Sequence, residues 1–110
     1  MKQRDLLLVP FPFSDQSGRK VRPVVVISND EFNENSEDLL VVGVTSNIFR
    51  DRYSIILTND DLEEGRLVTL CYIKSENILK IDKEFVIKKI GKIRKNKLDP
   101  VKKKILGIIS

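Results

Sequence analysis

The chain has 110 residues, a length that fits one domain and leaves little room for a second lobe. Hydrophobic residues make up 41% of it, which favours a folded globular protein over a disordered one. Because it has no histidine and one cysteine, Cys71, it excludes internal disulfides and histidine-dependent nucleophile systems and leaves too few ligands for a zinc site. We therefore expect a single domain over residues 1–110 with no metal and no cofactor.

Positive charge is concentrated in the C-terminal part of the chain. Residues 1–71 contain eight Lys/Arg and twelve Asp/Glu, whereas residues 72–110 contain twelve and four. A net charge of −4 is thus followed by one of +8, which gives +4 overall. This distribution indicates either a surface that faces a polyanion or lysines that keep a small domain soluble.

The N-terminal stretch from Leu6 to Phe13 is apolar and aromatic. Pro10 and Pro12 restrict it to an edge strand or a bent strand, and they leave the apolar run too short for a signal peptide or a membrane span. With Cys71 as a free thiol, these features predict a soluble, cytoplasmic protein without membrane attachment. A polar loop over residues 15–20 follows, since glycine and small polar residues favour turns.

The middle of the chain alternates strands with polar segments. Val21 to Ser28 contains four consecutive β-branched residues, which favours a central strand covered on both faces. Asn29 to Asp38 is expected to be a loop or one short helical turn. Leu39 to Thr45 is predicted to be a strand in which Gly43 marks a bulge or a point of close approach.

Further strands are predicted over Tyr53–Leu57, Leu67–Ile73, Ile78–Ile81 and Val86–Ile93. The chain is expected to end in a helix with Asp99 as N-cap and Pro100 as its first residue. The apolar face of that helix consists of Val101, Ile105, Ile108 and Ile109. Five to seven short strands and a C-terminal α-helix describe a small, mostly β barrel.

Two acidic clusters lie between the predicted strands: Asp30/Glu31/Glu34 and Asp60/Asp61/Glu63/Glu64. Carboxylates could in principle hold Mg²⁺, but acidic clusters of this kind are more often solvated turns.

The candidate functional residues lie at the ends of apolar strands. Arg22 could grip a phosphate with its planar guanidinium, or it could be tied to a local carboxylate such as Asp15. Thr45 and Ser46 could donate hydroxyl hydrogen bonds to a phosphate or ribose, or they could be ordinary turn residues.

Lys74-Ser75-Glu76 follows the strand predicted over Leu67–Ile73. This segment offers a cation and a general base or acid at a strand end, but as an isolated observation it is a weak signal.

Three blocks of sequence resemble one protein family. The stretch Gly18-Arg19-Lys20-Val21-Arg22-Pro23-Val24-Val25-Val26-Ile27 is similar to the glycine–x–x–arginine–proline–valine signature of MazF/PemK-type toxins. Arg4-Asp5 stands where that family usually has Gly-Asp or similar, ahead of the first strand. Val44-Thr45-Ser46 and Tyr72–Ile93, with Ile81-Asp82-Lys83, resemble the second and third blocks, so the resemblance covers essentially the whole chain.

The resemblance implies an SH3-like barrel of the CcdB/PemK kind, a homodimer with an RNA groove across its interface, and an antitoxin partner. The activity that it implies is metal-independent, sequence-specific cleavage of single-stranded mRNA to 2′,3′-cyclic phosphate and 5′-hydroxyl ends, which inhibits translation. The antitoxin segment is expected to be acidic and partly disordered.

Carried over by motif, Arg22, Thr45 and Glu76 would be catalytic. Glu76 would be the base and Arg22 the stabiliser or acid. The residues expected to bind substrate are Ser46, Lys74, Gln16, Ser17, Arg19 and Lys20.

The chain departs from the family pattern at two places. Gln16 and Ser17 stand where some relatives have a histidine, and Leu79 stands where an arginine often follows the third-block carboxylate. The alternative function is a non-catalytic binding toxin of the same fold, which would inhibit gyrase as CcdB does or bind RNA without cutting it. A small basic adaptor that recruits protein partners is a third hypothesis.

Overall fold

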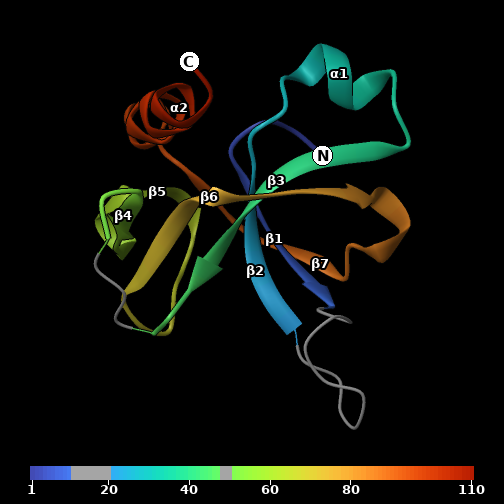
Figure 1. The fold of residues 1–110 in the computed structure, drawn as a ribbon. Helices are drawn as coiled ribbons and strands as arrows, with labels where there is room; N and C mark the ends of the chain where they lie inside the picture. The colour runs from blue at the N-terminus through green and yellow to red at the C-terminus, as the bar shows by residue number, and fades with distance from the viewer. Residues whose placement is uncertain (11–20, 48–50) are drawn as a thin grey trace, which may run out of the picture.

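The computed structural model describes residues 1–10, 21–47 and 51–110. Within these ranges, seven strands form one antiparallel sheet in the order β4-β6-β3-β2-β1-β7-β5 (Figure 1). The strands are β1 (Asp5–Pro10), β2 (Val21–Val26), β3 (Asp38–Thr45), β4 (Ser54–Leu57), β5 (Leu62–Gly65), β6 (Cys71–Asp82) and β7 (Lys88–Ile93). The helical elements are α1 (Asp30–Glu34), α2 (Lys95–Ile109) and the 3₁₀ turns η1 (Asn59–Asp61) and η2 (Lys83–Phe85).

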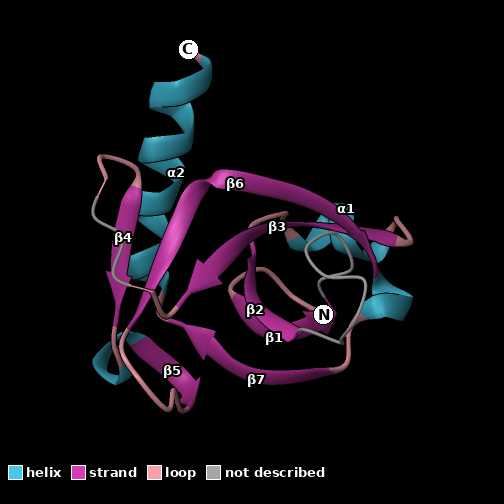
Figure 2. Cartoon of the chain, turned by 60° about the horizontal axis from the view of Figure 1, so that its bottom comes forward, coloured by secondary structure: helices cyan, strands magenta, loops and turns pink. Residues whose placement is uncertain are grey.

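The sheet curls into a half-barrel, and α2 covers one side of it. Figure 2 shows β3, β6 and β7 bending around β1 and β2, with α2 beside β4 and β6. The predicted class, a small and mostly β fold with a C-terminal helix, is therefore confirmed.

The central strand β2 is buried on both faces, as its run of valines predicts. Val25 packs with Leu98 and Val101 of α2 in one cluster, whereas Val24 and Val26 pack with side chains of β1 and β3 in the other. All five side chains are at most 1% exposed. Because both faces exclude water, the strand has no position for a polar residue until it reaches its end.

Strand β1 is bent, not an edge strand. It pairs with β2 on one side and β7 on the other, and its register with β7 shifts between Leu6 and Leu7. Pro10 is its last residue, where a missing N–H removes little from the ladder. Phe11, Pro12 and Phe13, the rest of the predicted strand, lie outside the described residues.

Strand β6 replaces two predicted strands. The predictions of Leu67–Ile73 and Ile78–Ile81 as separate elements were wrong, because β6 runs without interruption from Cys71 to Asp82. Its register with β3 passes from Gly43↔Lys74 to Val42↔Ile78, so three residues of β6 have no counterpart on β3. The polar segment Lys74-Ser75-Glu76, which suggested a strand end, lies instead within one long strand, where Ser75, Glu76 and Asn77 form a bulge.

The two acidic clusters are not simple loops. Asp30, Glu31 and Glu34 belong to α1, whose N-cap Asn29 accepts a hydrogen bond from the Phe32 N–H, so the short helical turn is confirmed. The second cluster spans η1 and β5, and its Glu63 and Glu64 lie on an unpredicted edge strand that pairs with β7. Strand β5 carries acidic side chains and was missed because it has too few apolar residues to show a pattern.

Helix α2 begins earlier than predicted. Arg94 is the N-cap, so Asp99 does not cap the helix and Pro100 lies inside it. Burial of Leu98 explains this start, because the helix must extend far enough to place that side chain in the core. Leu98 and Val101 are buried, whereas Ile108 and Ile109 at the other end of the same helix are exposed.

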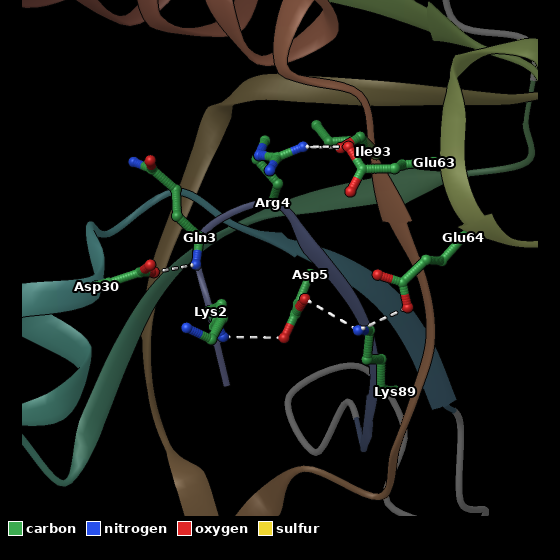
Figure 3. Close-up of polar contacts among 9 residues, drawn as sticks. All are labelled: Lys2, Gln3, Arg4, Asp5, Asp30, Glu63, Glu64, Lys89 and Ile93. Atoms are coloured by element: carbon green, nitrogen blue, oxygen red, sulfur yellow. Dashed lines mark hydrogen bonds and ion pairs between the residues drawn. The ribbon is translucent and has the colours of Figure 1, made fainter.

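The chain enters β1 through a turn in which Arg4 adopts φ +79°. This left-handed conformation costs a non-glycine residue about 1–2 kcal/mol. The Arg4 guanidinium donates to Glu63 Oε1 at 2.9 Å and to the Ile93 carbonyl at 3.0 Å (Figure 3). The hydrogen bond from Arg4 holds the pKa of Glu63 below its ordinary value. The arginine therefore ties the N-terminal turn to β5 and β7.

Asp5, next to Arg4, is buried, and its carboxylate also connects the N-terminal turn to β7. One of its carboxylate oxygens accepts a hydrogen bond from the Lys2 N–H at 2.9 Å, and the other lies 3.5 Å from Lys89 Nζ. Lys89 also binds Glu64, and that hydrogen bond raises the pKa of its ammonium group (Figure 3). The side chain of Lys89 thus links β1, β5 and β7.

Truncation of Leu98 tests the packing of α2 on the sheet. Leu98→Ala should lower the free energy of unfolding by about 2–5 kcal/mol, because it removes a fully buried side chain and leaves a cavity. Lys103→Ala, on the exposed side of the same helix, should change it by less than about 0.5 kcal/mol. Urea denaturation followed by circular dichroism measures both values. Equal losses in the two variants would contradict the described packing.

Candidate functional site

The start of β2 and the end of β3 lie side by side. The two strands are antiparallel with Val24 opposite Gly43, and continuing that register by two residues brings Arg22 level with Thr45. A hollow of about 160 Å³ opens over this point, and we call it the strand-end hollow. It is lined by Arg22, Pro23, Val24, Gly43, Val44, Thr45, Lys74, Asn77 and Leu79.

A second, wider hollow adjoins the first and has a volume of about 460 Å³. It shares Arg22 and Thr45 with the strand-end hollow and adds Ser46, Asn47 and Cys71. The structure therefore brings Arg22, Thr45, Ser46 and Lys74, four of the residues that the sequence singled out, together along one surface.

Lys74 reaches the strand-end hollow from β6, where it stands opposite Gly43 of β3. Its ammonium lies 3.2 Å from Glu76 Oε2, so the cation and the carboxylate form an ion pair. Glu76 itself is exposed and lines neither hollow. The site thus has two cationic groups in the hollow and one carboxylate at its rim.

Thr45 forms the turn that the sequence offered as an alternative. Its Oγ1 accepts a hydrogen bond from the Asn47 N–H at 3.1 Å, which fixes the hydroxyl oxygen at the end of β3. A hydroxyl has one proton to give in addition to its acceptor positions. The turn therefore orients Thr45 and leaves its O–H able to donate to a bound group.

Asn77 is a site residue that the sequence did not reveal. It lies in the β6 bulge and covers Gly43, where a Cβ atom would stand 2.4 Å from Asn77 Nδ2. The predicted close approach at Gly43 is confirmed, and its reason is the amide packed above it. A strand residue before a register shift gives no sequence signal of this kind, because the bulge decides which way the side chain points.

Asp51 is a second residue that the sequence did not single out. It accepts hydrogen bonds from the Tyr53 N–H at 2.8 Å and Ser54 Oγ at 3.1 Å. The Tyr53 backbone hydrogen bond is the main cause that lowers the pKa of Asp51, and the charge of Lys74 adds to it. Ser54 pairs with Lys74 across β4 and β6, so Asp51 adds negative charge beside Lys74.

The walls of the site region differ in part from what the sequence led us to expect. Leu79 lines the strand-end hollow where the family resemblance expects an arginine, so that wall is apolar. Burial raises the pKa of the Cys71 thiol, which disfavours the reactive thiolate. Gln16, Ser17, Arg19 and Lys20, and the proposed Arg22 partner Asp15, lie outside the described residues.

The donor set favours an anionic ligand. A guanidinium, an ammonium and a hydroxyl converge on one hollow, and these groups bind phosphate oxygens. In the described ranges, no three carboxylate or thiol side chains are placed to hold a metal ion. Neither of the described helices has the length and apolar character that crossing a bilayer requires.

One protein-family model matches nearly the whole chain. Residues 2–109 match the model of the family described as PemK-like, MazF-like toxin of type II toxin-antitoxin system. No protein of the curated set matches the sequence significantly.

Solved structures resemble the fold at low sequence identity. A MazE–MazF complex from Deinococcus radiodurans matches with a TM-score of 0.81 at 16% identity, covering 99% of this chain and 95% of that one. A mycobacterial endoribonuclease in complex with its cognate antitoxin matches with a TM-score of 0.79 at 13% identity, covering 99% and 94%. The Mycobacterium tuberculosis toxin MazF-mt6 matches with a TM-score of 0.77 at 14% identity, covering 96% of each chain.

Substitution of Gly43 tests the contact with Asn77. Gly43→Ala should displace the Asn77 amide, because the added Cβ cannot stand 2.4 Å from Nδ2. The loss of unfolding free energy should be smaller in an Asn77→Ala background, with a coupling of about 0.5–3 kcal/mol in the double-mutant cycle. Thermal or urea denaturation of the four proteins gives this coupling. Strict additivity would show that the two residues do not touch.

Proposed function

Because this chain belongs to the family of PemK-like, MazF-like toxins of type II toxin–antitoxin systems, we propose that it is an endoribonuclease that cleaves single-stranded RNA without a metal ion. The observation that carries the proposal is the convergence of Arg22, Thr45 and Lys74 on the strand-end hollow. Cleavage of mRNA at a short sequence would inhibit translation and growth. Single-stranded RNA suits the site because its phosphates and bases are accessible without unwinding.

The reaction needs charge stabilisation at phosphorus more than it needs a nucleophile from the protein. The ribose 2′-oxygen attacks the adjacent phosphorus, the bond from phosphorus to the 5′-oxygen breaks, and the products are a 2′,3′-cyclic phosphate and a 5′-hydroxyl end. Arg22 stabilises the negative charge that develops on the phosphate oxygens. The Thr45 hydroxyl, oriented by the Asn47 N–H, donates to the phosphate or the ribose. Ser46 supports the substrate in the adjoining hollow.

Two proton transfers complete the reaction. Glu76 takes the proton of the 2′-hydroxyl, since a carboxylate at the rim of the hollow can approach a substrate that enters from solvent. The leaving 5′-oxygen must gain a proton, and an ammonium gives up its proton more readily than a guanidinium does. Lys74, which lines the hollow, is therefore the better donor once Glu76 has accepted the 2′-hydroxyl proton and lost its negative charge.

We propose two protein partners, a cognate antitoxin and a second copy of this chain. A cognate antitoxin is proposed because solved relatives are complexes of a toxin and its antitoxin, and an acidic segment would suit a site with two cations. A homodimer is proposed because α2 leaves Leu106, Ile108 and Ile109 exposed to solvent in the single chain. Cys71 is a buried free thiol, which fits the reducing cytoplasm.

Arg22→Ala should lower the rate of RNA cleavage by about a hundredfold or more, because it removes the main group that stabilises the phosphorane charge. The measurement is cleavage of a long, sequence-diverse RNA in the presence of EDTA, with analysis of the product ends. The matched control is Arg66→Ala, which removes an exposed arginine that lines neither hollow.

The wild-type protein should leave cyclic phosphate and 5′-hydroxyl ends, and both variants should keep the circular dichroism spectrum of the wild type. Cleavage that survives in Arg22→Ala would overturn the assignment of the site. A wild-type protein that cuts no RNA in EDTA or in Mg²⁺ would overturn the enzymatic function and leave a binding toxin.

The dimer is tested by size. The wild-type chain should elute and sediment at twice its monomer mass of 12.7 kDa at micromolar concentration. Ile109→Asp should shift the protein toward the monomer, because it places a charge in the apolar surface of α2. A dimer that survives this change would place the interface elsewhere, whereas a monomeric wild type would contradict the dimer itself.

A further inference from the structure

A second cavity, of about 210 Å³, lies between the N-terminal turn, α1, β7 and the first half of α2. We call it the basic cavity. Its charged lining residues are Arg4, Lys92, Lys95, Lys102, Asp30 and Asp99. Four positive and two negative side chains therefore meet at one place, and the cavity has a net positive charge.

The lysine side chains of the basic cavity take part in no close ion pair that stabilises the fold in the described part of the chain. Within the described part of the chain, Lys92, Lys95 and Lys102 form no ion pair within 4.0 Å. Two carboxylates remain in the lining: Asp30, which accepts the Gln3 N–H at 2.9 Å (Figure 3), and Asp99. The cavity therefore keeps an excess of positive charge over its two carboxylates, which favours the binding of an anion.

The charge around the cavity extends beyond its lining. Residues 88–104, which form β7 and most of α2, contain nine Lys/Arg and a single Asp/Glu. The segment keeps a large excess of positive charge even when the ion-paired Lys89 and Lys97 are left out. Lys95 and Lys102 lie seven residues apart on one helix, about 10 Å along its axis, with Asp99 between them on the same face. Cations spaced over this distance suit the successive phosphates of a polymer better than a single small anion.

The basic cavity is separate from the strand-end hollow. Arg4 N donates to the Val26 carbonyl at 2.9 Å, so the cavity lies at the end of β2 that is remote from Arg22. Four residues of extended strand separate these two ends by about 13 Å. The cavity also includes residues of α2, whereas no residue of that helix lines the strand-end hollow.

We propose that the basic cavity binds the phosphodiester backbone of RNA segments that lie outside the cleavage site. The identity of the polyanion as RNA rests on the proposed function, whereas the site itself rests on its own residues. RNA is favoured over an acidic polypeptide because Leu98, the one apolar lining residue, is 1% exposed. A disordered acidic segment that orders on binding needs apolar anchors, and the cavity offers none to it.

The test measures binding of a 2′-O-methyl RNA of about twenty nucleotides, which cannot be cleaved because it has no free 2′-hydroxyl. The variant is Lys95→Gln with Lys102→Gln, which keeps helix propensity and removes two charges from the cavity. Its matched control is Lys103→Gln with Lys104→Gln, which removes two charges of the same helix that do not line the cavity.

The cavity variant should bind this RNA about tenfold more weakly at low salt than the wild type. The slope of log affinity against log salt should become smaller by about 1.4, the value for two lost contacts to single-stranded phosphates. The control variant should retain most of the affinity. Equal losses in the two variants, or no loss in either, would overturn the proposal.

Two further measurements distinguish RNA binding at the basic cavity from the binding of an acidic polypeptide there and from the cleavage of RNA at the strand-end hollow. Polyglutamate should not compete with the RNA for the cavity. Competition by polyglutamate that disappears in the cavity variant would assign the cavity to an acidic polypeptide and overturn the proposal. Cleavage of an RNA of about five nucleotides should proceed at the wild-type rate in the cavity variant. If the wild type cuts no RNA but the cavity variant still loses affinity, the proposed function fails and the basic cavity stands.

Discussion

Burial of the central strands on both faces is the constraint from which the rest of the molecule follows. Val24, Val25 and Val26 contribute to two separate apolar clusters, so the sheet must be covered twice. A chain of this length covers one face with α2 and the other with the curl of the sheet itself. Polar chemistry is therefore confined to the places where strands end or bulge, and the strand-end hollow lies at such a place.

Much of the fold could be predicted because its central strands have strong apolar patterns. The valine run of β2 and the helical spacing of α2 are local signals, and they indicate elements that the structure contains. The start of α2 at Lys95 and the single course of β6 depend on tertiary packing and register. A local pattern cannot report these, because Leu98 joins the core only when the whole sheet is present.

The residues of the candidate site likewise include some that the sequence could predict and some that only the tertiary structure reveals. Arg22 and Thr45 could be placed together because a motif names them, and their strands are neighbours. Asn77 and Asp51 could not, since Asn77 turns over Gly43 only through the bulge and Asp51 approaches Lys74 only through the pairing of β4 with β6. Glu76 is named by the same resemblance, but it stands at the rim as the ion-pair partner of Lys74 and not inside the hollow.

The turn at Arg4 makes the start of β1 depend on contacts made far along the chain. Only glycine adopts a positive φ without strain. In this chain Arg4 takes that conformation, while its side chain binds Glu63 and the Ile93 carbonyl. The strain of the backbone and the contacts of the side chain thus reside in one residue. Replacing Glu63 would leave that strain in place with only the Ile93 carbonyl to hold the guanidinium, so a substitution on β5 would loosen the start of β1.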